Sequence, residues 1–453
     1  MRSARRWGFW YHCVLVVFIS ACGATPAPGS GLRNTPDEGS ESGGPGGDST
    51  DSVSKKNQTR DPLKLSPNGK QFFDAGVMDG ANGRLDEAAR AFQKTIQTDP
   101  NAPQPYYNRG VVYERRGADL KALTYYRQSI QRKGDYLPAL SAAAKLLVRY
   151  EKRDEAVQLV RTAAERYGSN VDIMVLYANI LTMVQKYDDS IRVAKKALRI
   201  DERHAGAMLQ IGKANLKMGR LELAESIFNQ VLSINENIAE VHFLIGLLEL
   251  KKGFRILAIK KFEKAVSLNP FYPEALNNLA LEYMLAGNYN DAIQLFRRAI
   301  QITPSWGVLY LNYGNALRGA GKWKMALTAL NRAGKMLPNS PAVIFDMAIL
   351  YYTADNLNGL SRIARLKKSR SLFSEYKTRV GAALSQDDEV FKYIKELDLM
   401  IEREQIRVQR QKEAAEREQQ RAAHKTTPEQ NSGDAGAAGA EDESEGAADD
   451  GWE

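Results

Sequence analysis

The sequence predicts an all-α fold, a superhelical solenoid of about nine helix-turn-helix repeats followed by a long charged helix. Nine stretches with the same residue classes begin every 34 residues, at 69, 103, 137, 171, 205, 239, 273, 307 and 341. Position 8 of each repeat is Gly or Ala, and position 20 is small in the first eight repeats. Units that recur at a fixed period bury their apolar faces against their neighbours. We therefore expect one continuous array over residues 69–384.

The seventh repeat shows a physical reason for each recurring residue. Ala280 and Ala292 are small, which allows the two helices of the repeat to cross closely. Gly287 can adopt the left-handed conformation that ends the first helix. Phe296 fills the space between neighbouring repeats, and Pro304 stops the second helix. Each repeat is therefore predicted to form a helix, a tight turn and a second helix.

This pattern resembles the tetratricopeptide repeat (TPR) family over residues 69–355. The resemblance implies a binding groove lined by the first helices, and with it a protein that binds partner proteins and is not an enzyme. Glycine recurs at the turn and an aromatic residue at position 24 in many of the other repeats: Gly83, Gly117, Gly219, Gly253 and Gly321 for the turn; Phe92, Tyr126, Phe228 and Phe262 for the aromatic residue.

Two departures from the pattern bear on local structure. Glu151 and Gln185 replace the turn glycine in the third and fourth repeats, so we expect looser turns there. In the ninth repeat Leu360 breaks the row of small residues at position 20. Residues 356–364 are interpreted as an insertion that displaces the second helix of a degenerate capping repeat.

The chain beyond residue 384 changes in composition. Val390, Ile394, Leu397 and Ile401 form a narrow apolar seam, after which charges alternate. Residues 385–425 are predicted to form one long charged helix whose first half packs on the end of the array. Residues 426–453 contain nine acidic residues and no Lys or Arg, which predicts a disordered acidic tail.

The first 68 residues predict a membrane anchor and a linker. Arg2, Arg5 and Arg6 precede a short apolar run that ends in Ile19-Ser20-Ala21-Cys22. This segment resembles the cleavage box of bacterial lipoproteins, which implies a signal peptide over 1–21 and acylation of Cys22. Residues 22–68 are rich in Gly, Ser and Pro, so they are expected to be a disordered linker. Since Gly23 follows the cysteine where an inner-membrane lipoprotein carries aspartate, an outer-membrane lipoprotein facing the periplasm is favoured.

Positions 2, 5, 9 and 12 of each repeat should face the groove. Position 5 lacks the lysines by which some TPR grooves bind a free carboxyl terminus, so such a clamp is not expected. The groove should instead hold an extended or helical segment of an envelope protein. Lys145 is among its polar members, and packing between helices is the competing interpretation for any one residue. The predicted partner-binding residues are Tyr107, Val111, Asn179, Leu209, Lys213, Phe243, Leu247, Asn277, Leu281 and Asn315.

A second candidate surface is basic. The sixth repeat concentrates positive charge that could bind peptidoglycan or another anionic partner outside the cytoplasm, and nucleic acid is not expected. The four histidines are scattered, and no catalytic or cofactor motif is present, so no cofactor, metal or enzymatic activity is expected. The residues of this predicted basic patch are Lys251, Lys252, Arg255, Lys260, Lys261 and Lys264.

The last hundred residues resemble the TPR lipoproteins of the myxobacterial adventurous gliding-motility machinery. The similar elements are Asp346–Tyr352, the insertion at 356–364, Leu372–Lys377 and the helix from Asp387 with Ile401–Gln405. The resemblance implies a scaffold that assembles a gliding machine in the cell envelope. Two alternatives stay open: an assembly factor (pilotin) for a type IV pilus or secretion system, and an adaptor or activator of a peptidoglycan enzyme.

Overall fold

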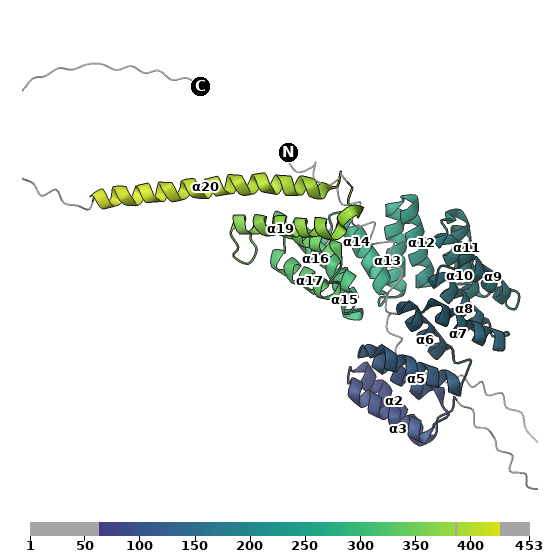
Figure 1. Cartoon of the computed structure of the whole chain (residues 1–453). Helices are drawn as coiled ribbons and strands as arrows, with labels where there is room; N and C mark the ends of the chain where they lie inside the picture. The colour runs from purple at the N-terminus through teal and green to yellow at the C-terminus, as the bar shows by residue number, and fades with distance from the viewer. Residues whose placement is uncertain (1–62, 386, 426–453) are drawn as a thin grey trace, which may run out of the picture. The chain divides into compact units, whose positions relative to one another are not determined.

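The computed structural model describes residues 63–385 and 387–425, and these residues form nineteen α-helices and one short 3-10 helix, with no strand (Figure 1). The fold class predicted from the sequence is therefore confirmed. In chain order the helices are α2 (Pro67–Ala81), α3 (Leu85–Thr98), α4 (Pro103–Arg115), α5 (Asp119–Arg132), α6 (Leu137–Arg149), α7 (Arg153–Arg166), α8 (Val171–Met183), α9 (Tyr187–Leu198), α10 (Ala205–Lys217), α11 (Leu221–Ile234), α12 (Ala239–Lys252), α13 (Arg255–Leu268), α14 (Pro273–Leu285), α15 (Tyr289–Ile302), α16 (Gly307–Gly319), α17 (Trp323–Met336), α18 (Pro341–Thr353), α19 (Arg362–Val380), η2 (Gly381–Ala383) and α20 (Glu389–Lys425).

Consecutive helices pair as the 34-residue period predicts. The even-numbered helices from α2 to α16 are first helices, and each packs on the odd-numbered second helix that follows it. Successive first helices also contact each other directly, as α6 does with α8, α8 with α10 and α14 with α16. The first helices therefore lie on the inner side of the stack, where neighbouring repeats approach most closely.

The turns between paired helices close in the same way whether or not glycine is present. The amide of Gly117 donates to Glu114 O (2.9 Å), and the next amide donates to Tyr113 O (2.9 Å). In the third repeat Glu151 N donates to Val148 O (3.0 Å), and Gln185 occupies the matching place in the fourth. Both side-chain-bearing residues take positive φ, 57° and 66°. The expectation of looser turns was wrong, because the hydrogen bonds impose the left-handed conformation at a cost in backbone strain.

Position 8 is small because an aromatic ring occupies the space beside it. A Cβ atom placed on Gly212 would lie 2.4 Å from Phe228 Cε1, and one on Gly246 would lie 2.5 Å from Phe262 Cε1. Phe228 and Phe262 are themselves completely buried. The small residue and the aromatic residue of each repeat are therefore a matched pair, which fixes how closely the two helices pack.

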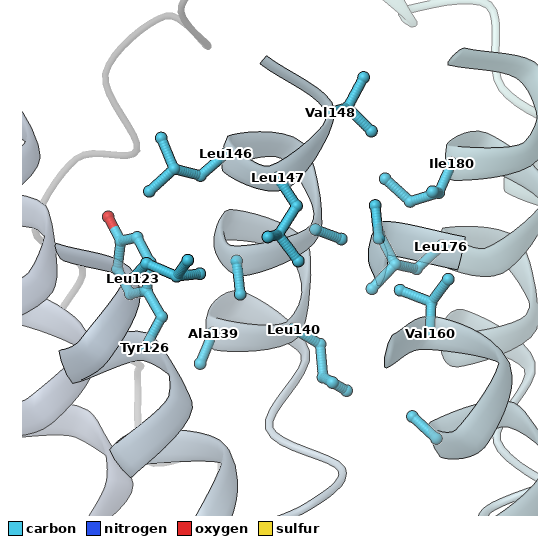
Figure 2. Packing of buried hydrophobic residues seen from close by; sticks show 14 of the residues in the cluster. Leu123, Tyr126, Ala139, Leu140, Leu146, Leu147, Val148, Val160, Leu176 and Ile180 are labelled. Atoms are coloured by element: carbon cyan, nitrogen blue, oxygen red, sulfur yellow. The ribbon is translucent and has the colours of Figure 1, made fainter. Parts of the chain in front are cut away.

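Buried side chains from consecutive helices form a continuous core along the array. In Figure 2, Leu123 and Tyr126 from α5 face Ala139 of α6, while Leu147 lies toward Ile180 of α8. Each side chain fills the space between two repeats, so every repeat depends on its neighbours for burial.

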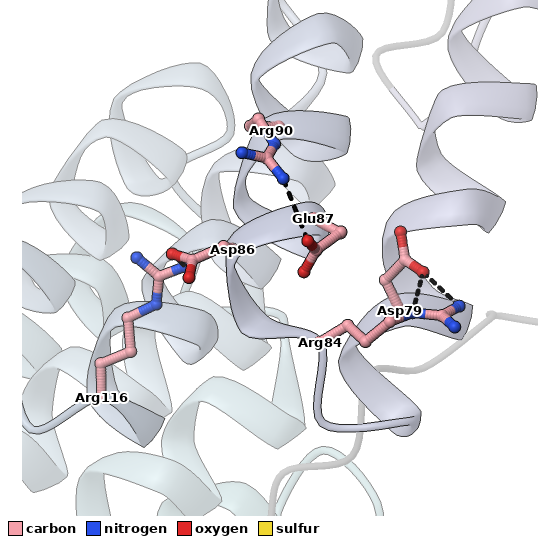
Figure 3. Close-up of polar contacts among 6 residues, drawn as sticks. All are labelled: Asp79, Arg84, Asp86, Glu87, Arg90 and Arg116. Atoms are coloured by element: carbon pink, nitrogen blue, oxygen red, sulfur yellow. Dashed lines mark hydrogen bonds and ion pairs between the residues drawn. The ribbon is translucent and has the colours of Figure 1, made fainter.

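Ion pairs add surface contacts between repeats. Arg116, at the end of α4, pairs with Asp86 of α3 at 2.6 Å, and Arg84 pairs with Asp79 across one turn at 2.6 Å (Figure 3). Most of these side chains are exposed, so each pair contributes at most about 1 kcal/mol. Apolar burial therefore dominates the stability of the array.

The described chain divides into two compact units between Asn358 and Gly359. The first unit ends with α18 and a loop whose Ala354 and Leu357 are buried in its core. The second contains α19 and α20. The sequence had placed residues up to 384 in the array and the insertion at 356–364, but α19 begins at Arg362 and groups with α20. The first unit therefore holds eight complete helix pairs and a ninth first helix.

Two interactions explain why α19 belongs with α20. The Phe373 ring stacks on Tyr393 at a centroid distance of 5.0 Å, and Arg370 Nε donates to Asp398 at 2.9 Å. Val390 and Leu397 of the predicted seam are completely buried. The seam therefore packs on α19, while the residues of α20 after Glu404 are mostly exposed.

No helix among the residues that the structure describes is long and apolar enough to cross a membrane. The predicted signal peptide, Cys22, most of the linker and the acidic tail lie outside those residues. Their assignments therefore stay predictions.

Candidate protein-binding surface

Position 5 of the repeat, predicted to line the groove, is part of the core. Phe243 is buried against Phe262 of its own repeat at 5.7 Å and against Tyr272 at 5.1 Å. Tyr107 makes the equivalent contacts with Tyr126 and Tyr136. The conserved spacing brings position 5 onto the aromatic residue at position 24, which closes it off from solvent. Leu209 and Asn277, also at position 5, are buried as well.

Position 9 differs between the ends and the middle of the array. Val111 near one end, and Leu281 and Asn315 near the other, are buried. In the four repeats between them, position 9 holds Lys145, Asn179, Lys213 and Leu247, and all four side chains are partly exposed. They lie on the consecutive first helices α6, α8, α10 and α12. We call these four residues the position-9 strip; it is the accessible part of the predicted groove.

The strip is electrostatically unsatisfied at one end. Burial lowers the pKa of Lys145, and the nearby charge of Lys213 lowers it further. Lys213 forms an ion pair with Glu240 of α12. Glu240 and Glu114 also favour the charged form of Lys145, but they do not cancel the first two effects. Two ammonium groups in a partly desolvated place repel each other, so an added carboxylate would stabilise both.

A row of buried polar side chains continues along the inner helices toward the end of the array. Asn312 Nδ2 donates to Asn277 Oδ1 at 2.9 Å, which joins α16 to α14. Asn315 Nδ2 donates to Asp346 Oδ2 at 2.7 Å, which joins α16 to α18. Burial raises the pKa of Asp346 to about 6, although Arg318 and the Asn315 hydrogen bond oppose this shift. These amides therefore hold neighbouring repeats together, so Asn277 and Asn315 have a structural role.

The predicted basic patch is smaller than its sequence suggested. Arg255 donates to the buried carboxylate of Glu282, with its Nε at 3.0 Å and an Nη at 2.8 Å. Lys252 pairs with Glu225 of α11. Both cations are therefore neutralised within the array. Lys251, Lys260 and Lys264 are exposed, and Lys261 is partly exposed.

The two histidines whose side chains are described have structural contacts. His204 Nδ1 accepts the amide of Ala207 at 3.2 Å and so caps α10, and Nε2 of buried His242 lies 2.8 Å from Glu236 O. Among the described residues, no three His, Cys, Asp or Glu side chains are grouped closely enough to hold a metal ion.

Sequence reasoning weighted Lys145 too little and missed Glu240 and Asp346. Lys145 shares position 9 with Asn179 and Lys213, so the repeat register alone could have grouped all three. Glu240 and Asp346 stand at positions 2 and 6 of their repeats, where no charge recurs. No sequence signal separated these two carboxylates from ordinary surface charges.

Three stretches of the chain match repeat families. Residues 205–238 and 273–305 match a tetratricopeptide repeat, and residues 80–117 match a TPR repeat. The first two matches begin at residues 205 and 273, where the 34-residue period places repeat starts. No curated protein matches the sequence.

Solved structures show the same fold. One is the crystal structure of the APC/C hetero-tetramer Cut9–Hcn1, with 15% identity, a TM-score of 0.50 and coverage of 73% of this chain. The chain covers 64% of that relative's length, less than two thirds. MamA protein has 23% identity, covers 38% of this chain and 94% of its own, and has a TM-score of 0.31. A thermophilic TPR protein of Thermus thermophilus has 19% identity, covers 40% and 100%, and has a TM-score of 0.36.

Identities this low support the fold and no partner or activity. The TPR matches, the 34-residue register and the paired helices agree with one another. The chain contains tetratricopeptide repeats and folds as a TPR solenoid, an architecture whose typical role is to bind other proteins.

Proposed function

We propose that this protein is a non-enzymatic scaffold that holds an extended segment of a partner protein along the position-9 strip. The segment would place a carboxylate between Lys145 and Lys213, hydrogen-bond to the Asn179 amide and lay an apolar side chain on Leu247. The observation that carries the proposal is the pair of partly desolvated lysines on the inner helices, where the pKa of Lys145 is lowered. Only a negative charge supplied from outside the array would satisfy both.

Charge reversal on the strip tests this proposal. A Lys145→Glu/Lys213→Glu double variant should lose the partners that co-purify with the wild-type chain, because two attractive contacts become repulsive. The matched control is Lys195→Glu/Lys196→Glu, which makes the same charge change on the exposed end of the second helix α9. Equal recovery of partners by the strip variant and the wild type would contradict the proposal, provided that circular dichroism shows equal folding.

We further propose that the scaffold is an outer-membrane lipoprotein, anchored through Cys22, that assembles a gliding-motility machine in the cell envelope. The lipoprotein-like box that ends at Cys22 and the resemblance of the last hundred residues support this proposal. Cys22→Ala should release the protein from the membrane fraction, since several acyl chains are needed for stable attachment. Retention of this variant in membranes would contradict the anchor.

The identity of the co-purified partners tests the machine. Motility-motor subunits that depend on Lys145 and Lys213 would support the gliding proposal. Pilus or secretion components would assign the scaffold to that apparatus. A peptidoglycan hydrolase or synthase would make it an enzyme adaptor and would contradict the motility assignment.

A further inference from the structure

The start of α13 differs from the start of most other second helices. Ile256 and Leu257 are 74% and 48% exposed, and Phe254, the residue that caps the helix, is 56% exposed. Most second helices of the array begin with an acidic residue, as α11 does with Glu222, whereas α13 has none in its first turn. Exposed apolar residues that occur singly need no explanation, but three within four residues form a patch.

The exposed lysines lie on the same side of α13 as these apolar side chains. Ile256, Lys260 and Lys264 are spaced by four residues, so they form one row along the exposed face of the helix. Leu257 and Lys261 form the adjacent row. Lys251 extends the surface onto the end of α12. The α13 patch therefore consists of Phe254, Ile256, Leu257 and the lysines 251, 260, 261 and 264.

The charge of the patch is not neutralised by its surroundings. The one acidic residue on the same face of α13, Glu263, accepts a hydrogen bond from the Tyr283 hydroxyl at 2.6 Å. The nearby cations with carboxylate partners, Lys252 and Arg255, are outside the patch. Four lysines thus surround three exposed apolar side chains.

We propose that the α13 patch docks on an anionic lipid bilayer. Lysines on flexible stems suit a surface of phosphate headgroups, and each contributes about a five-fold gain in partition near such a surface. Phe254, Ile256 and Leu257 would enter the boundary between headgroups and acyl chains. An acidic protein is the less suited occupant, because the patch lies on an exposed helix face, whereas protein hot spots occupy packed pockets. This inference does not depend on the position-9 strip or on Cys22.

Vesicle sedimentation of the full chain carrying Cys22→Ser tests the docking, because that change removes any attachment through acylated Cys22. The chain should sediment with phosphatidylcholine vesicles that contain phosphatidylglycerol, and not with phosphatidylcholine alone. Lys260→Glu/Lys264→Glu should lower the partition coefficient at least about ten-fold. Ile256→Ser/Leu257→Ser should also lower it, since the apolar contact is lost.

Two control variants separate the patch from general charge and exposure. Leu120 has the same repeat position as Ile256 in α5 and is 72% exposed, but its nearest exposed neighbours are not a lysine cluster. Leu120→Ser and Lys195→Glu/Lys196→Glu should therefore leave vesicle binding unchanged. Absence of wild-type binding to the anionic vesicles would overturn the proposal. Equal losses in patch and control variants, or lysine-dependent capture of an acidic protein without vesicle binding, would also overturn it.

Discussion

Glu151 and Gln185 occupy turn positions where the backbone favours glycine. Both adopt positive φ while keeping the hydrogen bonds of the glycine turns. A Cβ atom in this conformation costs about 1 kcal/mol. We therefore expect Glu151→Gly and Gln185→Gly each to raise the free energy of unfolding by about 0.5–1 kcal/mol, as measured by urea denaturation. Gly117→Ala, at an equivalent turn, is the opposite control and should lower it; stabilisation by this change would contradict the strain argument.

Asp346 should make the stability of the array depend on pH. Its pKa is raised to about 6 in the folded state, so the folded chain binds the proton more tightly than the unfolded chain. The stabilisation is present below pH about 4 and is lost as the pH rises through about 6. Its size is on the order of 1–3 kcal/mol. Urea denaturation from pH 4 to 7 should show a smaller loss for Asp346→Asn than for the wild type. An identical pH dependence of the two proteins would exclude this role.

The long helix α20 should depend on one face for its attachment to α19. Leu397 is completely buried, whereas Leu399, two residues along the chain, is exposed. Leu397→Ala should destabilise the α19–α20 pair by about 2–4 kcal/mol because it leaves a cavity. Leu399→Ala should change it by less than about 0.5 kcal/mol. Hydrogen exchange of α19 and α20 measures both effects, and equal protection in the two variants would contradict the packing.

The elements differ in how far the sequence could predict them. The repeat register located α2 to α18 because each position, such as Gly246 beside Phe262, has one packing role. It could not show that position 5 is closed off, since that depends on ring contacts such as Phe243 with Tyr272, contributed by separate helices. The register also failed after residue 353, where α19 packs on α20 and follows no neighbouring repeat. The position-9 strip was predictable as a row, but the burial that divides it was not.

At the scale of the whole molecule, the two compact units should unfold separately. A stack of repeats transmits destabilisation to its neighbours, and the division after Asn358 should interrupt this transmission. Gly246→Val forces a side chain against Phe262 and should increase hydrogen exchange around α12 and α13. Exchange in α19 and α20 should not change. Loss of protection in both units at once would show that they form one cooperative structure.

The central claim is that the inner helices, through the position-9 strip, hold a segment of a partner protein. The most direct test is photo-cross-linking in cells from a reactive amino acid placed at Asn179 on α8 and, separately, at Gln230 on the exposed surface of α11. Cross-links from position 179 to a small set of proteins, lost when Lys145 and Lys213 are changed to Glu, are predicted; position 230 should give none of them. The same partners captured from position 230 and not from position 179 would contradict the claim.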